Sequence, residues 1–405
     1  MTIAVNPGQI QEGQTGTTPR GKIFGMAIIA GAVVTNIYCV QPILPLMTAD
    51  LHISAANADL VAAATLLGFA TGMFFLLPLG DRFNRRLLVL LQIVLAFFLA
   101  GAAALAPNLP LLAAAAYGVG IVSCVPQQLT PFAAAISQPA ERGRSVGTVV
   151  SGIMVGILVG RTVAGVIGSA FGWRAVFAAE AAFMIPVGIA AAMMLPKSRP
   201  TTDLSYGRLM GSLIPLVANN RPLRESMVIQ SLLWACFNAF WVNLAALLRD
   251  GPLHLGSSWA GGFGLIGAAG AMAASLAGRG VDKRGPRWVV GAAILLVALS
   301  YVLLFKGGES LPLLVAGVII LDLGVQAGLV SNQTRAFAVD PKAQGRINTV
   351  YMTATFLGGG VGAVVSGQLM ERFGWTGVVW FGLAVGALAG LLHWIRPAPA
   401  SQAAR

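Results

Sequence analysis

The feature that most constrains this 405-residue chain is an internal repeat, because the sequence matches itself when it is shifted by about 202 residues. Asn36 then coincides with Asn238, and the segment Phe171–Trp173 coincides with Phe373–Trp375. A repeat this long, spread over almost the whole chain, predicts two similar halves. The other matching positions are Leu51-His52 with Leu253-His254, Asp81 with Asp282 (one residue out of step), Gly143-Arg144 with Gly345-Arg346, and Gly156, Gly160 and Gly165 with Gly358, Gly362 and Gly367.

Composition places both halves in a membrane. Hydrophobic residues make up 57% of the chain and charged residues 10%, whereas charged residues alone make up about a quarter of a soluble protein. The apolar residues form runs of roughly 20 to 25, long enough to cross a hydrocarbon core of about 30 Å as helices. We therefore predict an all-α membrane protein with twelve transmembrane helices in two pseudo-symmetric six-helix bundles. The predicted spans are 23–47, 58–80, 87–106, 109–136, 146–171, 175–195, 225–248, 258–279, 288–306, 311–336, 347–370 and 375–396.

The polar stretches divide the chain into five predicted segments. The first is rich in Gly, Thr and Gln, a composition typical of disorder. The stretch between the halves carries leucines at helical spacing, which fits either a short amphipathic segment on the inner membrane surface or a plain flexible linker. The segments are a disordered cytoplasmic tail (1–21), an N-terminal six-helix bundle (22–195), a cytoplasmic linker (196–224), a C-terminal six-helix bundle (225–396) and a cytoplasmic tail (397–405).

Lys and Arg are distributed unevenly between the loops. With the N-terminus inside, about 21 of them fall in the inner loops and tails, and the outer loops hold only Arg174, Arg249, Lys306 and Arg372. The positive-inside rule then places both termini in the cytoplasm. The formal net charge of +12 is explained by residues that face anionic lipid headgroups, so no nucleic-acid partner is predicted.

Two loops at equivalent positions of the repeat share a motif. The loop after the second span reads Leu77-Pro-Leu-Gly-Asp81-Arg82-Phe-Asn84-Arg85-Arg86, and its partner reads Gly278-Arg-Gly-Val-Asp282-Lys283-Arg-Gly285-Pro-Arg287. Both resemble the helix 2–3 signature of the major facilitator superfamily, G-x-x-x-D-R-x-G-R-R, although Leu77 and Asn84 replace two glycines in the first copy. The resemblance covers about residues 22–396 and implies the fold of that superfamily, in which two bundles surround a central substrate site.

The repeated loop implies a pair of cytoplasmic latches. A carboxylate at a helix end is stabilised by the N-terminal end of a neighbouring helix and by charge-assisted hydrogen bonds from arginine. The resemblance places Asp81 beside the Arg346 region, and it places Asp282 beside the Arg144 region. The alternative interpretation is that these are ordinary charges that set the membrane topology. The predicted gate residues are Asp81, Arg82, Arg85, Arg144, Asp282 and Arg346.

The fifth span resembles the helix 5 motif of the superfamily's antiporters, G-x-x-x-G-P-x-x-G-G, which is associated with export. It has glycines at four-residue spacing (Gly152, Gly156 and Gly160), while Arg161 stands where the motif has proline and Ala164 replaces a glycine. The same glycines are explained equally well as a smooth face for close packing against a partner helix.

Arg161 is the sharpest functional signal in the sequence. It lies roughly 15 residues into its span, where a charge costs at least about 2.5–3.5 kcal/mol, so it should face the protein interior and have a partner. Two acids inside the membrane are candidates for carrying a proton, since buried carboxylates often titrate in the physiological range. Asp322, near the middle of the tenth span, is the first candidate. The alternatives are static pairing to Arg161 and a hydrogen bond that bridges two helices. Glu180, at a shallower position in the sixth span, is the second candidate.

Polar residues concentrate in the spans that correspond to helices 1, 4, 7 and 10, which line the central cavity in this superfamily. On the seventh span, Trp234, Asn238 and Trp241 lie at i, i+4 and i+7 on one face. Aromatic and amide side chains together suit a neutral or weakly polar organic compound, although each polar residue taken singly is also explained by an interhelical hydrogen bond. The predicted cavity residues are Asn36, Tyr38, Gln41, Gln127, Gln128, Trp234, Asn238, Trp241 and Gln326.

Residues 340–375 and the segment Tyr38–Pro45 resemble the drug:proton antiporter branch and its bacterial sugar- and metabolite-efflux relatives. The resemblance implies a monomeric, proton-driven exporter of small organic molecules in the bacterial inner membrane, with protons and membrane lipids as partners. A proton symporter that imports an organic solute is the alternative. A polytopic membrane enzyme is disfavoured, because the histidines are isolated and no catalytic cluster or metal-ligand spacing is present. ATP-driven transport by this chain alone is disfavoured, because the sequence has no nucleotide-binding P-loop. No cofactor, metal or catalytic residue is therefore predicted.

Overall fold

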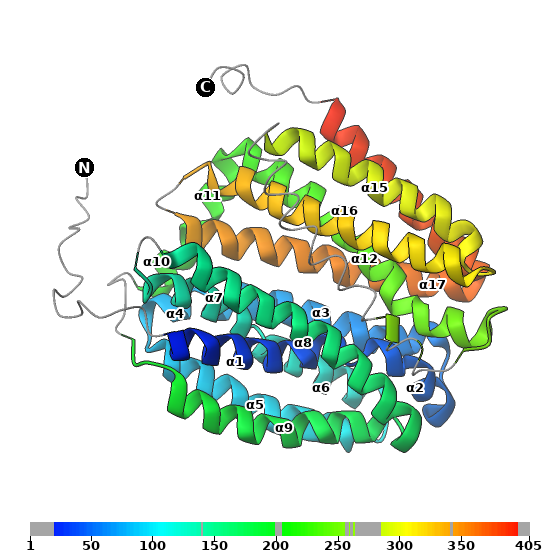
Figure 1. Ribbon diagram of the computed structural model, residues 1–405, viewed down its shortest axis with the longest axis horizontal. Coiled ribbons are helices and arrows are strands. Elements are labelled where there is room, and N and C mark those ends of the chain that lie inside the picture. Colours follow the sequence, from blue (N-terminus) through cyan, green and yellow to red (C-terminus); the bar gives the residue numbers. More distant parts are fainter. Residues whose placement is uncertain are drawn as a thin grey trace.

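The computed structural model describes residues 20–138, 141–198, 205–255, 259, 262–263, 285–340 and 343–395, with Asp81, Arg142 and Gly143 described by their backbone only. All regular secondary structure in these described residues is helical. Ten of the described helices are long and apolar enough to cross a membrane. They run side by side along the long axis of the molecule (Figure 1).

The N-terminal half contains the first six predicted spans. Prolines interrupt two of them, since proline lacks a backbone N–H and clashes with the preceding helical turn. The first span breaks near Pro42 and Pro45, and the fourth breaks just before Pro126. The helices of this half are α1 (Arg20–Tyr38), η1 (Gln41–Ile43), α2 (Leu44–Leu51), α3 (Ala55–Leu76), α4 (Leu79–Arg82), α5 (Arg85–Ala104), α6 (Leu109–Val122), α7 (Val125–Ala135), α8 (Arg142–Phe171) and α9 (Trp173–Met194).

The C-terminal half contains five further predicted spans within the described residues. The eighth span, 258–279, lies almost entirely outside them. The last two predicted spans form one long element, α17, which is broken at Gly374, where φ is 61° and ψ is −158°. The helices of this half are α12 (Arg221–Asp250), α15 (Pro286–Gly307), α16 (Leu311–Phe337) and α17 (Gln344–Trp394).

Two short helices occupy the polar stretch between the halves. These are α10 (Tyr206–Gly211) and α11 (Leu213–Asn219). Leu209 and Leu213, two of the residues at helical spacing, are buried. The hydroxyl of Tyr206 also donates to the backbone carbonyl of Phe75 in α3 (3.0 Å). The described part of this stretch is therefore a structured segment that packs on the helical bundle.

The repeat in the sequence reappears as a repeat of backbone turns. His52 and His254 are the two non-glycine residues with positive φ in the described part of the chain, at 52° and 48°. The left-handed conformation disfavours continued helix. His52 directly follows α2, and His254 lies four residues after the end of α12. Gly172 and Gly374 form a second matching pair, with φ of 83° and 61°. Each of these glycines joins two long helices through a single residue.

Glycines bring helices of the same half into close contact. A Cβ at Gly156 of α8 would collide with the backbone of Gly31 in α1, and a Cβ at Gly362 of α17 would collide with the backbone of Ala235 in α12. Membrane helices gain little from hydrophobic association in lipid, so small residues at the contact allow the backbones to approach. The packing face predicted for the fifth span is thus confirmed.

The two halves are hydrogen-bonded to each other at the end of the molecule that contains α2 (right in Figure 1). Arg249 Nη1 of α12 donates to the carbonyl oxygen of Pro45 in α2 (2.5 Å). At the same end, Ser54 Oγ before α3 donates to Glu371 Oε2 of α17 (3.4 Å). The sequence prediction assigns this end to the outer face of the membrane.

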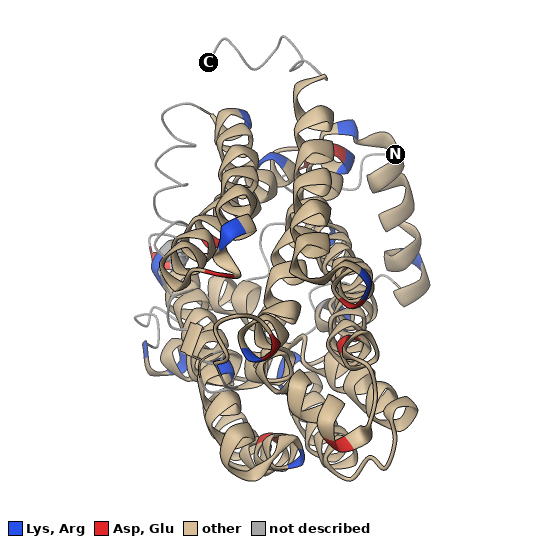
Figure 2. Ribbon diagram, turned by 90° about the vertical axis from the view of Figure 1, so that its right-hand side faces the viewer, with Lys and Arg blue, Asp and Glu red and all other residues tan. Residues whose placement is uncertain are grey.

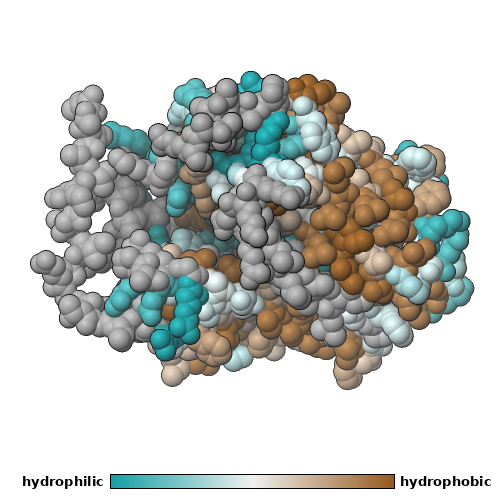
Figure 3. Space-filling view, turned by 45° about the horizontal axis from the view of Figure 1, so that its top comes forward, coloured by the Kyte–Doolittle hydropathy of each residue, from teal (hydrophilic) through white to brown (hydrophobic). Residues whose placement is uncertain are grey.

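The surface has the polarity of a membrane protein. Lys, Arg, Asp and Glu occupy a small part of the ribbon (Figure 2). One face shows a broad apolar region, with hydrophilic residues toward the ends of the long axis (Figure 3). Large apolar side chains that are more than half exposed, such as Phe98 and Val302, are explained by contact with lipid.

The α1–α8 contact generates a test on stability. Gly156→Ala should lower the thermal unfolding midpoint of the purified protein in detergent, because an added methyl group overpacks this contact at a cost of about 1–3 kcal/mol. Gly147→Ala is the matched control on the same helix, since nothing lies within 4 Å of its Cβ position. That variant should be neutral or more stable by up to about 1 kcal/mol, from helix propensity alone. Equal shifts in the two variants would contradict the contact.

Candidate functional site

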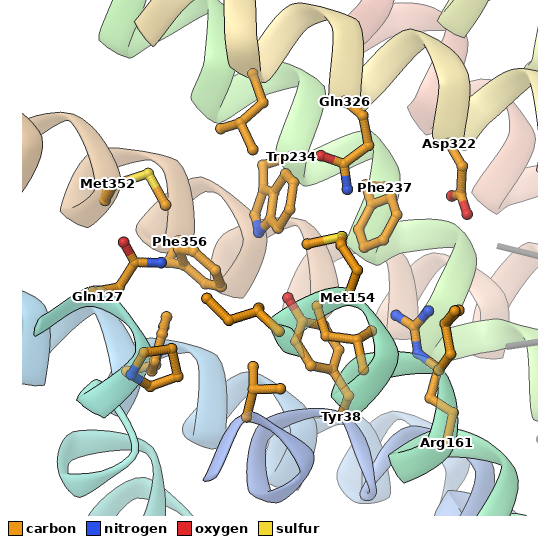
Figure 4. Close-up of a pocket in the computed structure, with 17 residues that line it drawn as sticks. Tyr38, Gln127, Met154, Arg161, Trp234, Phe237, Asp322, Gln326, Met352 and Phe356 are labelled. Atoms are coloured by element: carbon orange, nitrogen blue, oxygen red, sulfur yellow. The ribbon is translucent and has the colours of Figure 1, made fainter. Parts of the chain in front are cut away.

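A cavity lies between the two halves. Its walls come from α1, α3, α7 and α8 of the first half and from α12, α16 and α17 of the second. The lining is mostly apolar and aromatic with a few polar groups, as in sites for small organic molecules. The lining residues are Val34, Tyr38, Phe69, Pro126, Gln127, Ile153, Met154, Ile157, Leu158, Arg161, Trp234, Phe237, Asp322, Gln326, Leu329, Met352 and Phe356 (Figure 4).

Arg161 is held between aromatic rings. Its guanidinium carbon lies 3.7 Å from the ring centroid of Trp241 and 4.9 Å from that of Tyr38. Its Nε donates to Gln41 Oε1 (3.1 Å). A desolvated cation–π contact contributes about 2 kcal/mol, so rings and amide together offset much of the cost of a charge at this depth. Arg161 is 2% exposed, and it faces the protein interior as the sequence predicts.

Trp241 connects Arg161 to Asp322. One face of the indole lies against the guanidinium, and the indole Nε1 donates to Asp322 Oδ1 (3.3 Å). Asp322 is 4% exposed, and the ion pairs within 4 Å in the described residues do not include an Arg161–Asp322 pair. Since α8 belongs to the first half and α12 and α16 to the second, this three-residue link crosses between the halves.

Six of the sequence-predicted residues line the cavity, and five lie behind its wall. Gln41 and Trp241 hold Arg161, as described above. Asn36 Nδ2 donates to Ser123 Oγ (3.4 Å). Asn238 Nδ2 donates within its own helix to the carbonyl oxygen of Trp234 (3.0 Å), and Gln128 Nε2 contacts Cys124 Sγ at 3.7 Å. The six lining residues are Tyr38, Gln127, Arg161, Trp234, Asp322 and Gln326.

Glu180, the second predicted acid, lies apart from the cavity. It belongs to α9, and its Oε2 accepts a hydrogen bond from Thr35 Oγ1 of α1 (2.8 Å). Thr35 in turn lies against Gly160 of α8. Glu180 is therefore placed behind the cavity wall, in contact with a helix that lines it.

Two buried donors in the cavity wall have no hydrogen-bond partner among the described residues. They are Arg161 Nη2 and Trp234 Nε1. An unpartnered buried donor costs about 1–3 kcal/mol, and a bound molecule with oxygen acceptors would remove that cost. Tyr38, Phe237 and Phe356 supply apolar ring surface around these donors. The arrangement suits an organic molecule that has an apolar body and acceptor groups.

The sequence reasoning missed the apolar part of the wall. Phe69 and Phe356 close it from the two halves, with ring centroids 4.6 Å apart, and Phe237 stacks on Trp234 at 4.9 Å. Aromatic side chains occur on both the cavity-facing and the lipid-facing surfaces, as Phe237 and Phe98 do, so composition alone does not separate the two. A cavity-facing signal exists only in the spacing to a residue already assigned to the cavity, such as Phe237 three residues after Trp234.

The predicted latch pairs remain predictions. Asp282 lies outside the described residues, and so does the side chain of Asp81. Arg144 is exposed near the start of α8, and Arg346 is half-buried near the start of α17.

The other two gate residues contact their own half. Arg85 Nε donates to the carbonyl oxygen of Gly80 (2.9 Å), and its guanidinium carbon lies 5.6 Å from the ring centroid of Phe132. Arg82 is exposed, and its guanidinium carbon lies 5.9 Å from the ring of the adjacent Phe83. These contacts place both arginines at the end of the bundle opposite the Arg249–Pro45 contact.

Two helical halves that enclose a cavity with a buried acid and a buried base define a membrane transporter. The family model of the Major Facilitator Superfamily matches residues 26–338 and 271–405. This chain belongs to the Major Facilitator Superfamily. The predicted fold class, twelve transmembrane helices in two pseudo-symmetric six-helix bundles, is thereby confirmed.

Similar proteins agree with this assignment. An uncharacterized transporter of Escherichia coli O157:H7, YgaY, is 36% identical over 374 residues, which cover 92% of this chain and 94% of the relative. The chloramphenicol resistance protein of Streptomyces lividans is 28% identical over 287 residues, which cover 68% of this chain and 70% of the relative. A bacterial homologue of the human lysosomal transporter Spinster has a similar fold, with a TM-score of 0.77 and 15% identity over 95% of this chain and 100% of that chain.

The cavity generates a test by cysteine labelling. In detergent, Gln326→Cys should react with a charged methanethiosulfonate reagent, because position 326 lines the cavity. Asn238→Cys should stay unreactive because Asn238 is fully buried, and Leu299→Cys should do so because Leu299 is placed on the lipid-facing surface. The three native cysteines are buried and give a low background. Labelling of the Asn238→Cys variant without labelling of the Gln326→Cys variant, measured by mass spectrometry, would overturn the assignment of the wall.

Proposed function

We propose that this chain is a proton-coupled antiporter that exports small organic molecules across the bacterial inner membrane by alternating access. The observation that carries the proposal is the link from Arg161 through Trp241 to Asp322 at the cavity wall. In this proposal two six-helix units, 22–195 and 225–396, move around the cavity as a monomer, with both termini in the cytoplasm.

The proton acts on the link between the halves. When Asp322 is ionised, its charge is attracted to Arg161, and the indole between them is aligned by both groups. Charges interact strongly at low effective dielectric, so protonating Asp322 weakens the attraction between α8 and α16. Because these helices belong to different halves, proton binding and release alter the free energy of moving one half against the other. Glu180 is the second candidate, through its hydrogen bond to Thr35.

The substrate class is supported by the chemistry of the cavity wall. Apolar rings favour a flat organic body, while the unpartnered donors of Arg161 and Trp234 favour a molecule with oxygen acceptors. The Streptomyces lividans relative carries the name chloramphenicol resistance protein, which supports export rather than uptake. We therefore propose a small, uncharged or weakly polar organic compound as the cargo.

The gates complete the cycle. With the outer end held by the Arg249–Pro45 contact, the cavity would exchange with the cytoplasm. In the opposite state, Asp81 would pair with the Arg346 region and Asp282 with the Arg144 region, which would latch the inner end. The two sets of contacts would then alternate.

Replacing the acid tests the coupling. In proteoliposomes loaded with a cargo found by screening a metabolite and toxicant panel, Asp322→Asn should abolish transport driven by a pH gradient and should leave downhill exchange of cargo largely intact. The readout is cargo flux together with the fluorescence of a pH-sensitive dye. Glu180→Gln is the matched control and should keep gradient-driven transport.

Two results would count against this assignment. If Asp322→Asn retains full gradient-driven transport and Glu180→Gln loses it, the coupling residue is Glu180. If collapse of the proton gradient leaves wild-type export unchanged, the transport is not coupled to protons.

The latch is tested by Asp81→Asn. Loss of this carboxylate should slow export several-fold and shift the resting state toward an inner-open form, which is measured by thiol labelling from each side of the membrane. Asp50→Asn is the matched control, because Asp50 forms an ion pair with Arg174 of the same half. If the Asp81→Asn variant keeps both the labelling pattern and the export rate of the wild type, the predicted gate charges act only in setting the membrane topology.

One observation favours proton symport as the second candidate. Arg161 stands where antiporters of this superfamily have proline, and its Nη2 is unpartnered in the wall. If the cargo is an anion, protonating Asp322 removes the competing negative charge beside Arg161, so that proton and cargo bind to the same state. An affinity for the cargo that rises as the pH is lowered indicates symport. An affinity for the cargo that falls as the pH is lowered indicates antiport.

A further inference from the structure

A second site lies away from the cavity, between the first turns of α12 and the last turn of α17. We call it the basic groove. None of its residues lines the cavity. It is lined by Arg221, Arg224, Glu225, Val228, Ile229 and Leu392.

The charges at the basic groove do not balance. Glu225 accepts a hydrogen bond from Arg221 Nε (2.9 Å) and lies 3.4 Å from Arg335 Nη2. Arg224 directs its Nη1 at the carbonyl oxygen of Val217 in α11 (2.9 Å), a partner that carries no net charge. Arg221 and Arg335 therefore share the carboxylate of Glu225, and Arg224 adds a third positive charge, so these four residues carry an excess of two positive charges.

Donors remain available for an anion. A guanidinium has five N–H donors, and the bonds above use only Nε of Arg221 and Nη1 of Arg224. Arg221 keeps 62% of its side chain exposed. Arg335 is the more telling case, because its side chain is 12% exposed and its Nη1 is buried with no partner among the described residues. Arg335 does not itself line the groove, so its contribution is the positive charge that it adds behind Glu225.

The opposite wall of the basic groove is apolar and continues onto the lipid-facing surface. Val228 is 48% exposed, and beyond Leu392 the chain presents Trp394 and Ile395, which are 54% and 66% exposed. Tryptophan gathers at the level of the lipid headgroups. The groove also lies where one membrane helix begins and another ends. A soluble anion would make no contact with this apolar wall, whereas the acyl chains of a phospholipid would pack against it.

We propose that the basic groove binds one anionic phospholipid, with its phosphate on Arg221 and Arg224 and its chains along Val228 and Leu392. The positive-inside pattern assigns this end to the inner leaflet. Basic pockets between membrane helices on the cytoplasmic side are suited to anionic headgroups. Arg224 also holds the end of α11, so the lipid contacts the residue that connects the segment between the halves to α12. The proposal is independent of the cargo and of its coupling to protons.

The test measures lipid binding to the purified full-length protein by native mass spectrometry. Phosphatidylglycerol should remain bound after detergent washing and phosphatidylcholine should not. At about 1 kcal/mol per basic residue near the surface, the double variant R221Q/R224Q should bind phosphatidylglycerol roughly 30-fold more weakly. R20Q/R208Q is the matched control, because it removes two exposed arginines elsewhere in the described residues and should bind as wild type does.

Further arms exclude simpler explanations. R221K/R224K keeps both charges and should retain most of the binding, so a loss in R221Q/R224Q alone does not reflect misfolding. Inorganic phosphate at millimolar concentration should not displace the lipid. The proposal is overturned if phosphatidylcholine binds equally well, if both glutamine double variants lose binding to the same extent, or if inorganic phosphate displaces the lipid.

Discussion

The close approach of α1 and α8 determines where the charged groups of the cavity lie. Both helices run in the same direction, and Gly156 allows α8 to reach the backbone of Gly31. One turn later Gly160 lies against Thr35, and the next residue of α8 is Arg161. This short distance between the helices allows Arg161 to donate a hydrogen bond to Gln41 of η1. A wider contact would leave the cation in an apolar medium without an acceptor, at a cost that helix packing does not offset.

The position of Arg161 also makes the link between the two similar halves asymmetric, because each half contributes different residues to it. The repeat aligns Arg161 with Ala363, a fully buried residue of α17, so α17 carries no cation at the matching position. It supplies instead the indole of Trp241 and the carboxylate of Asp322. A cation from one half and an anion from the other, with a ring between them, hold the halves together without a direct ion pair. The desolvation cost of a buried pair is large, and a bridged arrangement allows each charge to keep a polar or aromatic partner of its own.

Much of the fold was predictable from sequence, because a membrane span must be a long apolar helix. The runs of apolar residues and the glycine face of α8 both follow from this requirement, whereas the breaks near Pro42 and Pro126 became apparent only in the structure. The candidate site was predictable only where a polar residue stood out, as Arg161 and Asp322 do. Which face of a helix meets the cavity depends on its rotation, and this explains why Asn238 points along its own helix. The indole of Trp241 lies between Arg161 and Asp322 because three helices meet there. A local sequence pattern does not indicate such contacts.

The single-residue joints at Gly172 and Gly374 have a mechanical consequence. Helix α8 ends at Phe171 and α9 begins at Trp173, so Gly172 alone separates the two helices. A displacement of the end of α8, the helix that carries Arg161, therefore also displaces the start of α9. The joint at Gly374 imposes the same constraint on α17. Each half therefore transmits a displacement at the cavity to the helix that follows its glycine joint.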